Sequence, residues 1–167
     1  GKLFDWTRQG QSNITVYYSG HGVPGLKDKR PYLLPVDGDA NRAEITGFPV
    51  DVLYENLSKL NAKSVTVYLD ACFTGESPKG MLVRSTSGIS ISPRMPSERS
   101  MTVITAAQGD QFASWDETAR HGLFTKHLLD ALNGKADTGK FGNENGAISL
   151  QEVRAYLDDE MTYQARR

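Results

Sequence analysis

The chain has 167 residues, enough for one compact domain with a single sizeable core. Its hydrophobic content of 38% and charged content of 23% are ordinary for a soluble globular protein. The formal net charge of −1 gives no global electrostatic reason to expect a nucleic acid or an anionic membrane as partner. No apolar run approaches the roughly 18–20 residues that span a bilayer, so the sequence predicts no transmembrane helix.

The single cysteine, Cys72, excludes a disulfide framework within the chain. Structural disulfides form mainly in oxidising compartments, so a chain with one thiol fits a reducing compartment more simply. We therefore expect a cytoplasmic protein.

Three short segments have the composition of buried strands, because they are β-branched or aromatic and contain no Gly or Pro. They span residues 14–18, 65–69 and 102–106. Near-continuous apolar character over about five residues is typical of strands covered on both faces. The three segments therefore predict a parallel sheet.

Apolar residues recur at helical spacing between and after these strands. One predicted helix begins near residue 50, and a second covers residues 124–132, with Gly134 just past its end as a candidate C-cap. A third begins at Ser149, because Ser149 and Glu152 have the spacing of a capping box. The residues expected on the buried faces are Val50, Leu53, Leu57, Leu60, Phe124, Leu128, Ala131, Leu132, Val153, Tyr156 and Leu157. Alternating strands and helices predict an α/β fold with a mostly parallel central sheet flanked by helices.

Two stretches interrupt this alternation. Residues 23–49 contain Gly, Pro and Asp clusters around residues 32–36, which is the pattern of a small hairpin excursion. Residues 76–100 are rich in Ser and Pro and carry more basic than acidic side chains. A structureless connection of that length is uncommon inside a compact domain and is usually functional or disordered.

Two ionisable residues come directly after the first two predicted strands. His21 lies in a Ser-Gly-His-Gly turn, and Cys72 lies in an Ala-Cys-Phe-Thr-Gly turn 51 residues later. Ligands bind outside the carboxyl ends of the strands in an open α/β sheet. If the two strands are parallel neighbours, the thiol and the imidazole reach the same edge of the sheet. A thiolate that attacks a carbonyl and an imidazole that transfers protons are the minimum for covalent acyl transfer.

The main chain beside these residues offers a second component. Gly22 leaves a backbone N–H open to close approach, and the N–H of Cys72 lies beside the attacked carbon, so the two are candidates for an oxyanion hole. A structural role is the simpler alternative for a lone Cys or His, because buried thiols commonly act as small hydrophobes. The placement of both residues in small-residue turns after strong strands favours chemistry instead.

The blocks around these two residues are Tyr17-Tyr18-Ser19-Gly20-His21-Gly22 and Asp70-Ala71-Cys72-Phe73-Thr74-Gly75. They resemble the catalytic His and Cys blocks of the caspase/metacaspase superfamily. Three more stretches are similar to caspase-like domains of the bacterial and metacaspase type: Tyr32-Leu33-Leu34-Pro35-Val36-Asp37, Thr105-Ala106-Ala107 and His121-Gly122-Leu123-Phe124-Thr125. The resemblance implies a caspase-like three-layer sandwich and a cysteine endopeptidase whose Cys–His dyad needs no metal or other cofactor.

The same resemblance bears on the substrate. Metacaspases place Asp two residues before the nucleophile and Ser two residues before the catalytic His, and hold Arg or Lys there, whereas true caspases have Gln before the nucleophile. Here these positions are Asp70 and Ser19, so we expect a basic P1 residue, which an anion in a partly desolvated pocket also favours. The alternative for Asp70 is a carboxylate that caps the following turn. Phe73 stands where metacaspases usually have His.

Two other interpretations of the whole chain stay open. One is a catalytically silent caspase-like scaffold that binds a protein partner. The other is a caspase-like peptidase with a non-basic P1 preference. An intact His21 and Cys72 argue against the scaffold.

The resemblance also assigns secondary roles. The loop that contains Asp110 and Asp116 can reach the substrate groove, so either residue is a candidate second acidic contact for a basic P1. The connection over residues 76–100 is often cut during maturation in this family, and an ordinary flexible loop is the alternative. Three basic residues there match the expected specificity of the enzyme and are candidate self-cleavage sites: Arg84, Arg94 and Arg99.

Some metacaspases are activated by Ca²⁺, so the resemblance allows calcium activation. Residues 143–152 overlay the later positions of an EF-hand loop, but the first ligand position would be Phe141, which cannot coordinate calcium. A tight turn that leads into the last helix explains these residues better. His121 and His127 are expected to be bystanders, His127 at the surface or boundary of its helix.

Caspase-like domains begin with a strand, a helix and a second strand before the strand that carries the His. Here only residues 3–6, expected to end a helix, precede that strand, and another edge strand is expected after the last helix. Exposed apolar faces and unpaired edges would result. We therefore expect residues 1–167 to be a fragment of a single caspase-like catalytic domain, with the rest of the polypeptide either bound as a second chain or absent from this sequence. Proteins or peptides are the expected substrates.

Overall fold

The computed structural model describes residues 2–73, 76–77, 80–81, 101–106, 115–116 and 121–165. The chain divides into two compact units, Gly1–Phe112 and Ala113–Arg167. In chain order the first unit contains α1 (Lys2–Trp6), β1 (Asn13–Ser19), β2 (His21–Pro24), β3 (Pro31–Leu34), η1 (Ala40–Arg42), α2 (Ala43–Thr46), β4 (Phe48–Pro49), α3 (Val50–Ser58), β5 (Ser64–Asp70), β6 (Glu76–Ser77), β7 (Gly80–Met81) and β8 (Met101–Thr105). The second contains β9 (Trp115–Asp116), β10 (His121–Gly122), α4 (Leu123–Leu132), η2 (Lys135–Asp137) and α5 (Leu150–Ala165). None of the helices described is both long and apolar enough to cross a membrane.

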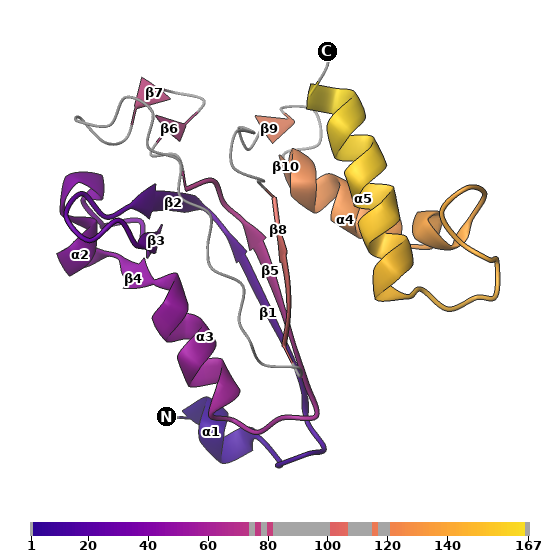
Figure 1. Ribbon diagram of the computed structural model, residues 1–167, viewed down its shortest axis with the longest axis horizontal. Helices are drawn as coiled ribbons and strands as arrows, with labels where there is room; N and C mark the ends of the chain where they lie inside the picture. The colour runs from indigo at the N-terminus through magenta and orange to yellow at the C-terminus, as the bar shows by residue number, and fades with distance from the viewer. Residues whose placement is uncertain are drawn as a thin grey trace. The chain divides into compact units, whose positions relative to one another are not determined.

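The first unit is built on a parallel sheet with strand order β1-β5-β8 (Figure 1). These are the three strands expected from the sequence, each extended by one residue at one or both ends or shifted by one residue. β1 and β5 run in register from Asn13 opposite Ser64 to Ser19 opposite Asp70. The predicted α/β fold with a parallel sheet is therefore confirmed.

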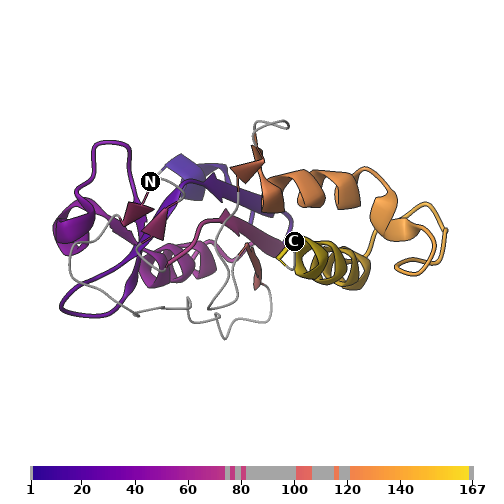
Figure 2. The same cartoon turned by 90° about the horizontal axis from the view of Figure 1, so that it is seen from above.

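Helix α3 packs along one face of this sheet, beside the three strands in both views (Figure 2). It buries Val50 and Leu57, as the helical spacing predicts, and also Tyr54, whereas the expected Leu53 is only partly buried. These side chains meet the inward residues of β5, of which Val67 and Leu69 are fully buried. The main core of this unit thus lies between α3 and the sheet.

Strand β1 differs from the expectation that both faces are covered. Its burial alternates along the strand, and Thr15, Tyr17 and Ser19 are exposed, Tyr17 to 50%. Among the described residues β1 has a hydrogen-bonded neighbour strand, β5, on one side only. An edge strand with one covered face has this alternating pattern, so its apolar composition alone overstated its burial.

The predicted hairpin excursion is confirmed as an antiparallel sheet of order β2-β3-β4. Its register places His21 opposite Leu34 and Pro24 opposite Pro31. His21, expected in a turn, is instead the first residue of β2. The glycines on both sides of His21 conceal the strand in the sequence, because glycine is depleted from strands.

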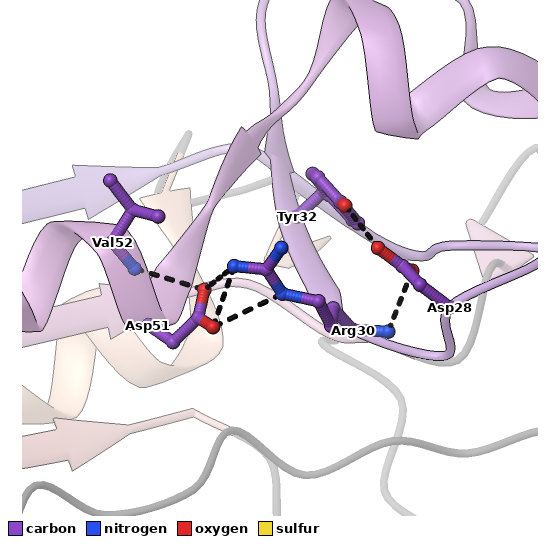
Figure 3. A network of polar contacts seen from close by, with 5 residues as sticks. All are labelled: Asp28, Arg30, Tyr32, Asp51 and Val52. Carbon is purple, nitrogen blue, oxygen red and sulfur yellow. Dashed lines mark hydrogen bonds and ion pairs between the residues drawn. The ribbon is translucent and has the colours of Figure 1, made fainter.

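A polar network joins the far end of this hairpin to α3 (Figure 3). The guanidinium of Arg30 makes a bidentate ion pair with Asp51 in the first turn of α3, with a shortest N–O distance of 2.6 Å. The hydroxyl of Tyr32 donates to the carboxylate of Asp28, and the amide of Arg30 donates to the same carboxylate at 3.0 Å. Burial and the bond to Asp28 raise the pKa of Tyr32 to about 12, so it remains a donor. The network orients the hairpin against the helix.

In the second unit α4 and α5 lie side by side. The apolar face of α5 buries Val153, Tyr156 and Leu157, as expected. On α4 two expectations were wrong: Leu132 is 44% exposed, and His127 is only 4% exposed rather than at the surface. Both ring nitrogens of His127 lack a hydrogen-bond partner among the described residues, because the ring faces the neighbouring helix next to Tyr156.

The turn before α5 has the expected capping box. The N–H of Ser149 donates to Glu152 Oε2 at 2.7 Å, and the N–H of Glu152 donates to Ser149 Oγ at 3.3 Å. Residues 143–147 form a tight turn in which the buried carboxylate of Asp137 accepts from the N–H of Gly146 at 2.7 Å. Gly134, the candidate C-cap of α4, has a φ of +112° and donates to the carbonyl of Ala131.

Candidate active site

His21 and Cys72 lie at the same edge of the parallel sheet. β1 ends at Ser19 and β5 ends at Asp70, and these two residues are register partners. Only Gly20 separates the end of β1 from His21, the first residue of β2. Cys72 lies two residues after the end of β5. Neighbouring parallel strands are about 4.8 Å apart, so the two chain segments leave the sheet side by side. The expected juxtaposition of the two strand ends is therefore present.

Two backbone contacts hold the segments together beyond the sheet. The N–H of Gly20 donates to the carbonyl of Asp70 at 3.1 Å, which continues the ladder past the end of β1. Gly22 then lies directly against the other segment: a Cβ there would be 2.7 Å from the carbonyl oxygen of Cys72 and 2.6 Å from the ring of Phe73. Only a residue without a side chain fits this approach.

The exposure of the site residues differs sharply. His21 and Ser19 are exposed, whereas Cys72 is 8% exposed and Asp70 is 5% exposed. Phe73 is buried in the core under α3 and lines the contact with Gly22. Cys72 is therefore largely covered, whereas His21 is accessible to solvent.

A tyrosine that the sequence pattern marks only as a strand residue also belongs to this edge. The hydroxyl of Tyr18 lies 2.9 Å from the carbonyl oxygen of His21 and 3.1 Å from that of Leu34. Its position three residues before His21, with a serine and a glycine between them, is the only sequence signal that could have indicated this contact.

Several other predicted residues cannot be placed at the edge of the sheet. Asp110 and the candidate cleavage residues lie outside the described residues. Asp116 belongs to β9 in the second unit, where its main chain pairs with that of His121. The candidate cleavage residues are Arg84, Arg94 and Arg99.

The side chains that are described show no metal centre. Across that part of the chain, no group of three or more His, Cys, Asp or Glu residues could hold a metal ion. In the stretch compared with an EF-hand, the side-chain oxygens of Asn143 and Asn145 accept backbone N–H groups of the turn itself, and Asp137, which precedes the stretch, accepts the N–H of Gly146. Such bonds build a turn and explain why polar residues occur there.

The arrangement supports acyl-transfer chemistry at the end of β5. A thiol, an imidazole and the closely packed main chain of a glycine come from two segments in backbone contact, and a carboxyl and a hydroxyl lie on paired strand ends beside them. These are the kinds of group that a cysteine nucleophile, its proton-transfer partner and an oxyanion hole require.

A comparison with protein families supports the same conclusion. The model of the caspase domain family matches residues 4–165, a stretch that includes both compact units and the whole edge described above. A comparison with curated proteins gives no match. The chain therefore belongs to the caspase domain family of cysteine peptidases.

Proposed function

We propose that the chain is a cysteine endopeptidase that hydrolyses peptide bonds in proteins or peptides, with Cys72 as nucleophile and His21 as its acid/base partner. The observation that supports it is the delivery of both residues to one sheet edge by paired, parallel strands. The thiolate of Cys72 adds to the scissile carbonyl carbon. The imidazolium of His21 then gives a proton to the leaving amine as the C–N bond breaks, and water activated by the imidazole hydrolyses the thioester.

The oxyanion formed in the first step is stabilised by the backbone N–H groups of Gly22 and Cys72. The close approach of Gly22 to the main chain of Cys72 supports this pairing, because both donors then belong to one small region. Loss of a single oxyanion donor typically costs about 3–4 kcal/mol of transition-state stabilisation.

A basic P1 residue is the proposed specificity. Ser19 and Asp70 are register partners at the strand ends, and Asp70 is only 5% exposed as a residue. A buried carboxylate next to a substrate pocket favours a cationic side chain, whereas an acidic P1 side chain would leave two like charges together. Asp110 and Asp116 remain candidate additional contacts.

Fluorogenic peptides with Arg, Lys, Asp or Ala at P1 test both parts of the proposal. We expect wild type to cleave the Arg and Lys peptides and Cys72→Ala to cleave none. Asp70→Asn should lower kcat/KM for the basic peptides by at least about tenfold, because the charge-assisted contact is lost. Preferred cleavage of the Asp or Ala peptide would contradict the basic P1 specificity and support the non-basic alternative.

One observation favours a second candidate function, a silent scaffold that binds a protein partner in its groove. Cys72 is only 8% exposed as a residue, which limits access for a substrate carbonyl. A folded wild-type sample that turns over no peptide, and whose Cys72 does not react with a peptidyl electrophile, would support the scaffold and contradict the peptidase.

Self-processing is a further part of the proposal. Cleavage after Arg84, Arg94 or Arg99 would match the enzyme's own basic specificity. Intact mass after incubation should show cleaved wild type and uncleaved Cys72→Ala. Identical masses for the two samples would leave residues 76–100 as an ordinary connection.

The proposed chemistry needs no metal, and its thiol nucleophile suits a reducing compartment such as the cytoplasm. We expect EDTA to leave turnover by an active sample unchanged. Loss of turnover in EDTA and its recovery on addition of Ca²⁺ would show calcium activation instead.

A further inference from the structure

Tyr18 occupies a position where three strands meet. Its ring packs against the core cluster that lies under α3 and contains Tyr54 and Phe73. From there the hydroxyl reaches the carbonyl oxygens of His21 at 2.9 Å and of Leu34 at 3.1 Å. One side chain of β1 thus contacts the first residue of β2 and the last residue of β3.

These two carbonyls belong to the terminal pair of a ladder. His21 and Leu34 are register partners at the end of the β2–β3 hairpin nearest to Cys72. The phenol has one proton, so its hydroxyl donates a single shared hydrogen bond between these two carbonyls at this end of the ladder. Burial raises the pKa of Tyr18, so the hydroxyl keeps its proton and remains a donor well above neutral pH.

The turn between β1 and β2 is shaped around this hydroxyl. A Cβ on Gly20 would lie 2.8 Å from the hydroxyl oxygen of Tyr18 and 3.1 Å from Cζ of the same ring. A side chain at residue 20 would therefore push the phenol away from the two carbonyls. The glycine and the tyrosine form one fitted unit immediately before His21.

The main chain around His21 is consequently held at three successive residues. Gly20 is bound to the carbonyl of Asp70, Gly22 lies against Cys72, and the carbonyl of His21 itself meets the hydroxyl of Tyr18. The first two contacts attach the segment to the end of β5. The third fixes the orientation of the peptide group between His21 and Gly22.

We propose that Tyr18 is a positioning residue for the proposed reaction: its hydroxyl fixes the main chain of His21 so that the imidazole is held in line with Cys72. This inference rests on the proposed peptidase function. It differs from a purely structural role, in which the hydroxyl would stabilise the hairpin without any effect on how His21 and Cys72 interact.

Tyr18→Phe tests the inference, with Tyr54→Phe as the matched control. Both changes remove one hydroxyl from an aromatic ring in the same core cluster, but only the hydroxyl of Tyr18 reaches His21. We expect Tyr18→Phe to lower kcat about three- to tenfold, the value of one hydrogen bond, with KM changed by less than about twofold. Tyr54→Phe should change neither.

The pH dependence of Cys72 alkylation by iodoacetamide provides a readout that needs no turnover. His21→Ala gives the profile of a thiol without its imidazole partner. Tyr18→Phe should move the wild-type profile toward that reference, because a displaced imidazole stabilises the thiolate less. If wild type cleaves no peptide but Tyr18→Phe moves this profile, the peptidase assignment fails while the positioning role stands.

Gly20→Ala completes the test. It should reproduce the effect of Tyr18→Phe on the alkylation profile, and it should add little in the Tyr18→Phe background, because both changes remove the same contact. Wild-type kcat and a wild-type alkylation profile in Tyr18→Phe, with only a lower melting temperature, would overturn the positioning role. A wild-type profile equal to that of His21→Ala would overturn it as well.

Discussion

Gly22 lies so close to Cys72 and Phe73 that even one added methyl group would disturb this edge of the parallel sheet. A methyl group there would meet the carbonyl oxygen of Cys72 and the ring of Phe73, both held in buried main chain and core. We expect Gly22→Ala to move β2 away from the end of β5 and to lower kcat/KM by more than about tenfold, the usual consequence of misplacing a catalytic group. Peptide kinetics together with a thermal melt would measure both effects.

Gly139→Ala is the control for this change. Gly139 has a φ of +58° and open space around its Cα, so alanine there introduces backbone strain of about 1–2 kcal/mol without a clash. We expect a lower melting temperature with unchanged kcat/KM. Equal activity losses in the two variants would mean that general destabilisation, and not the contact of Gly22 with Cys72, explains the effect.

The hydroxyl of Tyr54 is buried without a hydrogen-bond partner among the described residues, and burial raises the pKa of this side chain to about 12. An unsatisfied buried polar group typically costs about 1–3 kcal/mol. Tyr54→Phe should therefore be neutral or raise the free energy of unfolding, as measured by urea denaturation. A clear loss of stability would show that the hydroxyl has a partner after all.

His127 should make the second unit sensitive to mild acid. Burial lowers the pKa of its ring, against the opposing carboxylate of Glu160, whose Oε2 lies 3.9 Å from Nδ1. Asp130 also opposes the shift, and Lys126 and Lys135 reinforce it. Below about pH 6.5 the unfolded chain binds a proton at His127 more readily than the folded chain does. The free energy of unfolding therefore falls as the pH drops, by at most about 1.4 kcal/mol per pH unit.

The free energy of unfolding between pH 7.5 and 5.5 measures this effect. We expect the decrease to be smaller in His127→Gln than in wild type, and larger in Glu160→Gln, because the opposing carboxylate is then absent. Equal decreases in wild type and His127→Gln would show that His127 does not cause the loss of stability in acid.

At the scale of single elements, the start of α5 depends on its capping box. The side chains of Ser149 and Glu152 each accept the backbone N–H of the other residue. Ser149→Ala should lower the free energy of unfolding by about 1 kcal/mol, whereas Ser149→Thr retains the acceptor oxygen and most of the stability. Chemical denaturation of the two variants would show equal losses if the cap contributed nothing.

Element patterns predicted from the sequence succeeded where one local signal dominates. The β-branched runs gave β1, β5 and β8, and the Ser149–Glu152 spacing gave the start of α5. His21 was expected in a turn because its flanking glycines are weak strand formers, and its strand exists only through pairing with β3. Local propensity cannot report a partner that lies elsewhere in the chain.

Dependence on partners elsewhere in the chain also explains what the sequence missed at the candidate site and on α4. Strand direction and adjacency sufficed to bring His21 and Cys72 to one edge. The contact of Tyr18 with His21, however, depends on how a ring leaves the core, and the burial of His127 depends on the packing of α5 against α4. Neither has a periodicity that a sequence pattern could display.

At the scale of the whole molecule, the family match spans both compact units, while the residues at the edge of the parallel sheet lie in the first. β1, the strand that leads to His21, is bonded to β5 on one side, and no strand pairs with its other side within the described residues. The pairing of a second chain with this side of β1 stays a prediction.

The parallel register of β1 and β5 has a consequence for how such a site can change. The two strand ends that lead to His21 and Cys72 are separated by 51 residues in the chain, yet a ladder of backbone hydrogen bonds places them side by side. The loop that joins β2 to β3 lies at the other end of that hairpin, so it can change in length without moving the two strand ends, provided that both strands keep their pairing. Changes at Tyr18 or Gly22, by contrast, alter the contacts of the edge itself.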